Sequence, residues 1–384
     1  MTTSFLSNSD QNGHFLGRVW SPSAGGPCVV TLRAGQVIDI TSRECPTVRD
    51  ICELDDPVGY VSGAEGTALG SLGELGANKI GDAAKPYFLA PCDLQSIKAC
   101  GVTFASSMVE RVIEEQAAGD SQKAEAIRKR VAEAIGDSLK NIKAGSAEAE
   151  KVKQALIQEG LWSQYLEVGI GPDAEVFSKA QILSSVGPSA DVGLHPISSW
   201  NNPEPEVVLT VSSKGRIVGA CLGNDVNLRD VEGRSALLLS KAKDNNASCS
   251  IGPMIRLFDD TFSLDDVRKA ELTLTVEGTD DYVLNGHSSM SEISRDPEDL
   301  VNQTIGRHHQ YPDGLMLFLG TLFAPTEDRD VPGEGFTHKI GDVVRISAPG
   351  LGSLENTVRL STECDEWTFG VSHFMRNLAS RDLI

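Results

Sequence analysis

Residues 204–253 have the sequence EPEVVLTVSSKGRIVGACLGNDVNLRDVEGRSALLLSKAKDNNASCSIGP, and this stretch decides the fold. The β-branched run 207–211 and the apolar run 217–222 flank the turn sequence SSKG, which predicts a β-hairpin. Side chains two residues apart on a strand share a face, so Glu204 and Glu206 are predicted to lie side by side.

The turn sets the register of this hairpin. With its centre between Ser213 and Lys214, Glu204 lies opposite Gly223, and Asp225 follows just beyond. Three carboxylates then meet at one end of the hairpin, where each raises the pKa of the others. A hard divalent cation held by oxygens, such as Mg²⁺, removes that cost. In the ordinary alternative, the two glutamates flank a strand start and Asp225 caps the next helix.

The order of short motifs after the hairpin adds a resemblance to a known family. Glu-Pro-Glu, Asn224-Asp225 with Arg229 four residues later, Lys241-Ala-Lys-Asp244 and Ile251-Gly252-Pro253 resemble the ordered motifs of the fumarylacetoacetate hydrolase superfamily. Further matches are Asn285-Gly286, Gly320-Thr321, the segment IGDVV at 340–344 and the segment LGSLEN at 351–356. The resemblance spans about residues 165 to 360. It departs from the family pattern at Leu319 and Leu322, where the family has Thr and Pro.

This resemblance implies a fold and a metal site. The fold is an α+β, β-rich architecture, a mixed β roll of the fumarylacetoacetate hydrolase kind with an N-terminal β unit and a helical insertion. Mg²⁺, with Mn²⁺ or Ca²⁺ as substitutes, is expected on Glu204, Glu206 and Asp225. The ion would stabilise an enolate of a 2-oxo acid, and Lys241 would stand beside it with further positive charge.

A second segment resembles the lid found in sugar-acid branches of the same superfamily. It comprises GVTF at 101–104 with Ser107, Arg111 and Glu114. Arg111 and Glu114 are three residues apart and share a helix face, so an intrahelical ion pair is the ordinary interpretation. The resemblance instead implies a lid helix over the metal, with Glu114 as the group that moves protons.

Five residues are expected to bind substrate. Lys179 belongs to a segment similar to the family's P-x-x-F-x-K strand and could reach a substrate carboxylate; its ordinary interpretation is a surface lysine. Ser107, Arg111, Gly320 and Thr321 complete the predicted contacts.

Two enzyme classes share these motifs. One cleaves C–C bonds of acylpyruvates with water activated by a His-Glu pair on the lid. The other removes the C4 hydroxyl of a 2-keto-3-deoxy sugar acid, as in pentose oxidation, where a D-arabinonate or D-xylonate derivative gives 2,5-dioxopentanoate. Between His14 and His195 the chain has no histidine, which favours the dehydratase. A non-catalytic binding module is the third hypothesis, and the retained carboxylates and Lys241 weigh against it.

Composition limits the partners. The 384 residues carry 34 Lys and Arg against 54 Asp and Glu, a formal net charge of −20, which disfavours nucleic acid. No stretch of about 18 apolar residues occurs, so no membrane span is expected. The N-terminus has no signal-peptide pattern, and eight scattered cysteines without a C-x-x-C pair favour a cytoplasmic enzyme with reduced thiols. We expect a small anionic 2-oxo acid as the partner and a homodimer or homotetramer as the assembly.

Three domains are expected: an N-terminal β-rich unit over 1–90, a lid segment with a helical insertion over 91–164, and a metal-binding catalytic unit over 165–384. In the first, runs 28–32 and 37–40 predict a hairpin, and Thr47 with Asp50 predicts a capping box. The Gly-rich segment 62–85 is expected to be a surface loop or linker. Apolar spacing through Ala124, Ile127, Val131 and Ile135, and a start at Ser146, predict two helices in the second.

Overall fold

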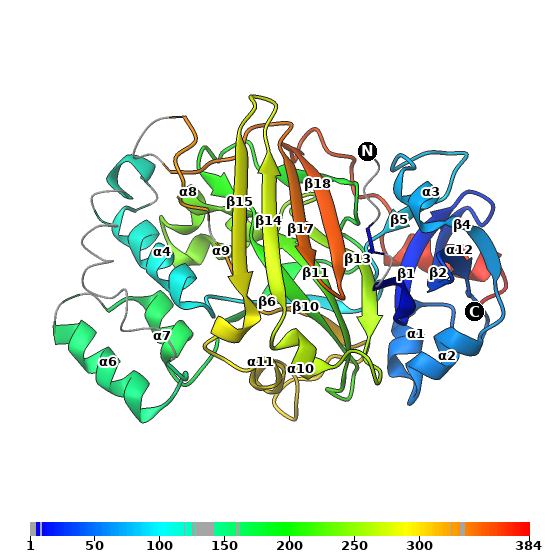
Figure 1. Ribbon diagram of the computed structural model, residues 1–384, viewed down its shortest axis with the longest axis horizontal. Helices are drawn as coiled ribbons and strands as arrows, with labels where there is room; N and C mark the ends of the chain where they lie inside the picture. Colours follow the sequence, from blue (N-terminus) through cyan, green and yellow to red (C-terminus); the bar gives the residue numbers. More distant parts are fainter. Residues whose placement is uncertain are drawn as a thin grey trace.

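The computed structural model describes residues 5–7, 10–118, 120–124, 127, 142–158, 160, 162–323, 325–330 and 335–384. Two large sheets form its centre, a group of helices lies at one end and a small β-rich unit lies at the other (Figure 1). The predicted β-rich α+β fold is confirmed. In the part of the chain that the structure describes, no helix is both long and apolar enough to cross a membrane.

An 11-stranded sheet connects the N-terminal strands with the rest of the chain in the order β4-β3-β2-β1-β13-β11-β10-β16-β6-β7, and β5 pairs with β1. Its strands are β1 (Phe15–Ser21), β2 (Gly26–Arg33), β3 (Gln36–Asp39), β4 (Thr67–Ser71), β5 (Tyr87–Leu89), β6 (Ser96–Cys100), β7 (Val176–Ala180), β10 (Pro205–Val211), β11 (Ile217–Asp225), β13 (Cys249–Leu257) and β16 (Leu315–Phe318).

A five-stranded sheet has the order β15-β14-β17-β18-β8. Its strands are β8 (Asp191–Leu194), β14 (Glu271–Glu277), β15 (Val283–Ser289), β17 (Val343–Ala348) and β18 (Gly352–Leu360). On β14, Leu272, Leu274 and Val276 are buried and alternate with more exposed residues, as expected for a strand with one face on a core. They share a hydrophobic cluster with Val207 and Leu209 of β10. One face of the β10–β11 hairpin is thereby covered by the second sheet.

The opposite face of the hairpin packs on the N-terminal unit. Val208 and Cys221 share a second cluster with Val48 and Ile51 of α1 (Val48–Glu53). The hairpin is therefore buried on both faces, which explains why its strands are apolar throughout rather than alternating.

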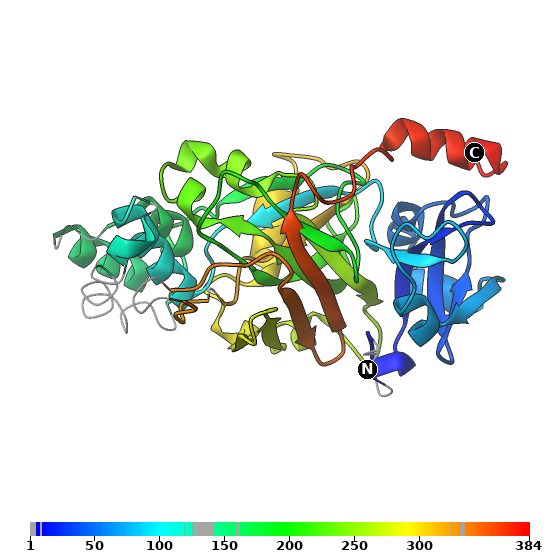
Figure 2. The ribbon, with the colours of Figure 1, turned by 90° about the horizontal axis from the view of Figure 1, so that it is seen from above.

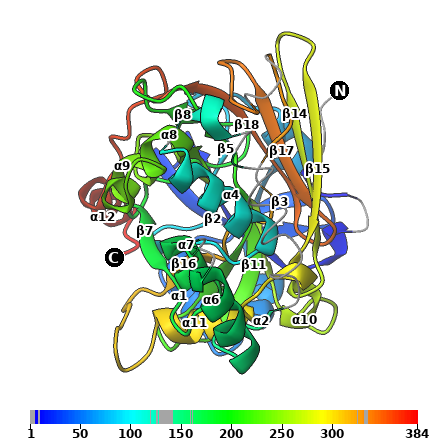
Figure 3. The same ribbon diagram turned by 90° about the vertical axis from the view of Figure 1, so that its left-hand side faces the viewer.

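Most helices are short. They are α2 (Pro57–Gly63), α3 (Leu72–Gly76), α4 (Ala105–Gln116), α6 (Ala147–Gln158), α7 (Gln164–Ile170), α8 (Arg229–Glu232), α9 (Leu239–Lys243), α10 (Leu264–Val267), α11 (Pro297–Thr304) and α12 (Val371–Ser380). Helices α4, α6 and α7 lie together at the end that faces the viewer in Figure 3. The C-terminal α12 lies beside the N-terminal unit in the view of Figure 2. A two-stranded ladder joins β9 (Asn201–Asn202) to β12 (Asn227–Leu228).

Several local predictions are confirmed. Strands β2 and β3 form the expected hairpin, and Thr47 and Asp50 form the capping box of α1. Helix α6 begins directly after Ser146, whose hydroxyl accepts from the Ala149 amide. The segment 62–85 is not simply a loop, because it contains β4 and α3. The predicted helical positions Val131 and Ile135 lie outside the described residues, and the three-domain division stays a prediction.

Candidate active site

Three acidic side chains meet where β10 begins and β11 ends. One oxygen from each of Glu204, Glu206 and Asp225 lies within 4.8 Å of the others, and these residues are only 1–2% exposed. The predicted register is wrong by two residues: Glu206, not Glu204, pairs with Gly223, and the Asp225 amide donates to the Glu204 carbonyl at 3.0 Å. Part of this offset is a one-residue register shift between Thr210 and Val211. The total offset at the carboxylates is even, so they keep their common face.

Two buried lysines compensate part of this charge. Lys243 Nζ lies 2.6 Å from Glu204 Oε2 and 3.2 Å from Asp225 Oδ2, and Lys179 Nζ lies 3.0 Å from Asp225 Oδ1. Burial alone would raise the pKa of Asp225, but the two ammonium groups outweigh it and hold that pKa below its usual range.

Among the residues that the structure describes, no lysine or arginine forms an ion pair with Glu206. Burial, together with Asp225 and Glu204, raises the pKa of Glu206 well above its usual range. Its Oε2 accepts from the Gly320 amide at 2.8 Å. Gly320 has φ +95°, and a Cβ there would lie 2.3 Å from Thr103 Oγ1, so glycine is needed for this approach. The cluster is thus held by backbone as well as by lysines.

The position predicted for Lys241 is wrong. Its ammonium group is exposed and hydrogen-bonds with His195 Nε2 at 2.9 Å, whereas Lys243 at the end of α9 enters the acidic cluster. The sequence Lys-Ala-Lys-Asp offers two lysines, and residues two apart on a helical turn point in different directions. The short helix α9 directs the second one inward.

Helix α4 contributes a buried charge network. Arg111 pairs with Glu204, with Glu114 (Nη1–Oε2 2.6 Å) and with Glu232 (Nη1–Oε2 3.0 Å), and Arg229 Nε lies 3.0 Å from Glu114 Oε1. Burial disfavours the charge of Arg111, but its three carboxylates raise its pKa well above the usual range. The ion pair expected between Arg111 and Glu114 therefore exists, buried rather than exposed, and both Glu114 oxygens contact guanidinium groups.

A narrow internal cavity lies against the acidic cluster. Arg111, Thr321, Glu204 and Glu206 line it, and so does Glu175, which precedes β7. Glu114 is not among the lining residues.

Glu175 was not among the predicted site residues. Burial, with the nearby Glu232 carboxylate, raises the pKa of Glu175 to about 7. A Cβ on Gly101 would lie 1.9 Å from its Oε2, so the glycine leaves the room that this carboxylate fills. The signal in the sequence is weak, because Glu175 lies in an unremarkable loop segment, PDAEV.

Of the five predicted substrate contacts, two line the cavity and three do not. Arg111 and Thr321 line the cavity. Ser107 donates to the Thr321 carbonyl at 2.8 Å, and Gly320 binds Glu206, so both shape the wall without facing the cavity themselves. Lys179 is fully buried behind Asp225 and bonds to the Lys243 carbonyl, so it neither lies on the surface nor lines the cavity.

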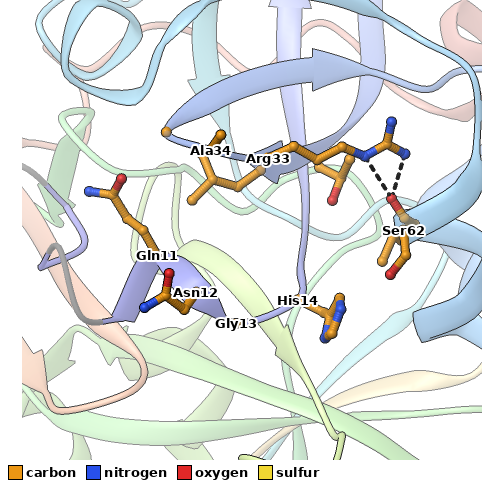
Figure 4. Close-up of a pocket in the computed structure, with 11 residues that line it drawn as sticks. Gln11, Asn12, Gly13, His14, Arg33, Ala34 and Ser62 are labelled. Carbon is orange, nitrogen blue, oxygen red and sulfur yellow. Dashed lines mark hydrogen bonds between the residues drawn. The ribbon is translucent and has the colours of Figure 1, made fainter.

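A wider hollow lies in the N-terminal unit, between the segment 11–14, the β2–β3 turn and Ser62 (Figure 4). Its charged groups are already occupied. Arg33 donates to the Val61 and Ala64 carbonyls at 2.6 and 2.7 Å, and His14 Nδ1 lies 2.6 Å from Asp259. The cavity at the acidic cluster is therefore the better candidate for chemistry.

Comparisons with known proteins agree with the resemblance drawn from the motifs. Residues 176–359 match the family described as fumarylacetoacetate (FAA) hydrolase C-terminal. The chain is 32% identical over 194 residues to a probable 2-keto-3-deoxyxylonate dehydratase of Haloferax volcanii, covering 50% of this chain and 63% of that protein. It is 29% identical over 188 residues to the 2-dehydro-3-deoxy-D-arabinonate dehydratase of Saccharolobus solfataricus, covering 48% and 58%. The matched part thus spans about three fifths of these curated relatives.

Solved structures show the same fold. A 2-keto-3-deoxy-D-arabinonate dehydratase complexed with magnesium and 2,5-dioxopentanoate superposes with a TM-score of 0.63 at 19% identity, over 90% of this chain and 99% of that one. A fumarylacetoacetate hydrolase of Exiguobacterium antarcticum gives a TM-score of 0.54 at 16% identity, over 90% and 99%.

Proposed function

We propose that this protein is a Mg²⁺-dependent dehydratase that converts a 2-keto-3-deoxy-pentonate, 4,5-dihydroxy-2-oxopentanoate, into 2,5-dioxopentanoate and water. The observation that carries the proposal is the buried three-carboxylate cluster, which lies against a cavity lined also by Glu175, a carboxylate with no ion pair or hydrogen bond among the described residues. The names of the curated relatives support the substrate class.

The donor set fits a hard divalent ion. Glu204, Glu206 and Asp225 offer oxygens only, at a mutual separation suited to one small cation. The pKa of Glu206 is raised well above its usual range. This indicates that the two lysines compensate only part of the negative charge of the three buried carboxylates. When bound there, Mg²⁺ would act as a Lewis acid towards the 2-oxo group and carboxylate of the substrate.

The chain's own residues would supply orientation and proton transfer. Lys243 adds positive charge beside the cluster, where negative charge develops on the 2-oxo oxygen as the C3 proton leaves. The C4 hydroxyl then departs as water after it receives a proton. Loss of water leaves a C3=C4 double bond, and transfer of a proton from C5 to C3 moves it to C4=C5, giving an enol. The enol becomes the aldehyde when its C5 hydroxyl loses a proton and C4 gains one, so the product has lost one water and no oxidant is needed.

Glu175 suits the proton transfer better than Glu114. It lines the cavity, and within the described residues no ion pair or hydrogen bond holds its carboxylate. A carboxyl group with a pKa of about 7 exchanges protons readily near neutral pH. Glu114 instead holds Arg111 and Arg229 in place, so we propose a positioning role for it.

The alternative is C–C hydrolysis of an acylpyruvate. Among the described residues that line the cavity there is no histidine to pair with a glutamate and activate water. A panel of both C4 epimers of 4,5-dihydroxy-2-oxopentanoate and several acylpyruvates, each with Mg²⁺ and with chelator, tests the proposal. We expect an aldehyde product with loss of one water and only with Mg²⁺. Release of pyruvate and a carboxylic acid from an acylpyruvate would support the hydrolase instead.

A further inference from the structure

Two polar groups of the cavity wall have no partner in the part of the chain that the structure describes. These are the hydroxyl of Tyr165, on α7, and the carboxylate of Glu175. Tyr165 is only 7% exposed, and it lines the cavity. A hydroxyl or carboxylate that faces a cavity without a protein partner can form a hydrogen bond with a ligand that fills the space.

Tyr165 is held firmly by the helical insertion. Its amide donates to the side chain of Ser163, the N-cap of α7, at 3.1 Å. It shares a hydrophobic cluster with Met108 and Val112 of α4. The phenol ring therefore has a fixed direction, as a group that distinguishes between ligands requires.

The cations of the cavity are already paired. Arg111 contacts three carboxylates, and Lys243 contacts Glu204 and Asp225. Beyond the acidic cluster the described wall adds Glu175 and Glu232, both acidic. A ligand whose own carboxylate is held at the cluster would bring any second carboxylate against these acids, with no free cation to receive it. Hydroxyl groups, in contrast, can donate to carboxylates and accept from a phenol.

We infer that Tyr165 and Glu175 form a subsite for the distal hydroxyl of the ligand and exclude ligands with a distal carboxylate. The inference rests on the proposed function, because it takes the 2-oxo acid end to lie at Glu204, Glu206 and Asp225. Both residues lie outside 176–359, so the subsite would be a property of this chain's insertion and its adjoining loop rather than of the matched segment.

Binding of unreactive ligands tests the subsite without turnover. 5-Hydroxy-2-oxopentanoate, 2-oxopentanoate and 2-oxoglutarate share the 2-oxo acid end, and none has the C4 hydroxyl needed for dehydration. We expect the whole chain with Mg²⁺ to bind the hydroxy acid best and 2-oxoglutarate worst by calorimetry. Tyr165→Phe should lower the preference for 5-hydroxy-2-oxopentanoate over 2-oxopentanoate by about 3- to 10-fold, the usual worth of one hydrogen bond. Affinity for 2-oxopentanoate should stay unchanged.

Two further variants complete the experiment. Glu175→Gln should strengthen 2-oxoglutarate binding relative to 2-oxopentanoate, because it removes a repelling charge. Tyr311→Phe, a change on a tyrosine packed against His309 and outside the cavity, is the matched control and should leave every preference intact. An unchanged preference in both Tyr165→Phe and Glu175→Gln, or tighter binding of 2-oxoglutarate than of the hydroxy acid, would overturn the subsite alone. Failure of all three ligands to bind with Mg²⁺ would overturn the proposed function beneath it.

Discussion

At the scale of single residues, two lysines two positions apart have opposite environments. Lys243 is 3% exposed and contacts two carboxylates of the cluster, whereas Lys241 is exposed and contacts His195. We expect Lys243→Met to abolish measurable turnover and to weaken binding of an anionic 2-oxo acid. The reason is that it leaves Glu204 and Asp225 without their shared cation.

Lys241→Met is the matched control, with the same chemical change on the same short helix. It should keep kcat and KM within about 2-fold, since the exposed contact between Lys241 and His195 contributes little free energy. Steady-state kinetics and calorimetric binding of pyruvate with Mg²⁺ compare the two variants. A severe loss in Lys241→Met with a mild effect of Lys243→Met would reverse the assignment.

A second pair of residues separates proton transfer from positioning. Because the pKa of Glu175 is raised, this group favours folding most below its unfolded pKa, and the contribution is lost as pH rises towards about 7. In metal-free protein we expect wild-type stability to fall over pH 5–7 by at most about 1.4 kcal/mol per pH unit from this group. Glu175→Gln should remove that slope, and should also lower kcat by about 10² to 10⁴ and remove the limb of the kcat profile near pH 7.

Glu114→Gln provides the comparison. It breaks a buried ion-pair network, so it should lower the melting temperature at every pH while leaving the pH at which kcat changes where it is. Denaturant titrations and pH–rate profiles of both variants measure these effects. Disappearance of the kinetic limb in Glu114→Gln, but not in Glu175→Gln, would return the proton-transfer role to Glu114.

The three carboxylates of the candidate site could be predicted from the sequence, whereas the lysine beside them and the other cavity residues could not. Glu204, Glu206 and Asp225 could be grouped because strand periodicity puts alternate residues on one face, and that rule survives an even shift of register. The choice between Lys241 and Lys243 depends on where one short helical turn begins, which local pattern does not fix. Glu175 and Tyr165 reach the cavity only through the tertiary placement of a loop and of α7, so their spacing carried no signal.

At the scale of elements, α4 links the insertion to the acidic cluster. Arg111 on this helix contacts Glu204 directly, and Ser107 donates to the carbonyl of Thr321 in the cavity wall. We expect α4 and α7 to gain hydrogen-exchange protection when Mg²⁺ and pyruvate are added together, because the ligands bind on the wall that these helices complete. Helix α12 lies at the other end of the molecule and is the internal reference (Figure 1).

Hydrogen exchange of the segments 105–116 and 164–170, measured by mass spectrometry, tests this prediction. The expected change is slower exchange in both segments with no change in 371–380. Equal exchange with and without ligands would contradict the lid interpretation, and α4 would then be a static wall.

At the scale of the whole molecule, one sheet runs from the N-terminal unit to the strands of the candidate metal site. The connection is the antiparallel pairing of β1 with β13, at Phe15 with Arg256 and Leu16 with Ile255, and β13 in turn pairs with β11. The sequence predicts an N-terminal β-rich unit and a metal-binding unit, but it could not show this pairing. These strands are about 240 residues apart in the chain and pair only through tertiary contacts, which local sequence patterns do not reveal.

This continuity leads to a prediction about unfolding. Because one face of the β10–β11 hairpin shares a core with the five-stranded sheet and the other shares a core with the N-terminal unit, the chain should unfold in one calorimetric transition. An ion bound to Glu204, Glu206 and Asp225 then stabilises the whole chain, by about 2.7 kcal/mol when Mg²⁺ is at 100 times its dissociation constant. The melting temperature should rise by a few degrees.

Glu206→Gln should remove this rise while its metal-free form melts no lower than the wild type, because the substitution removes a buried charge and keeps an acceptor for the Gly320 amide. Glu271→Gln, on the exposed side of β14, should respond to Mg²⁺ as the wild type does. Two transitions, of which only one moves with Mg²⁺, would show that the β1–β13 pairing does not couple the N-terminal unit to the metal site.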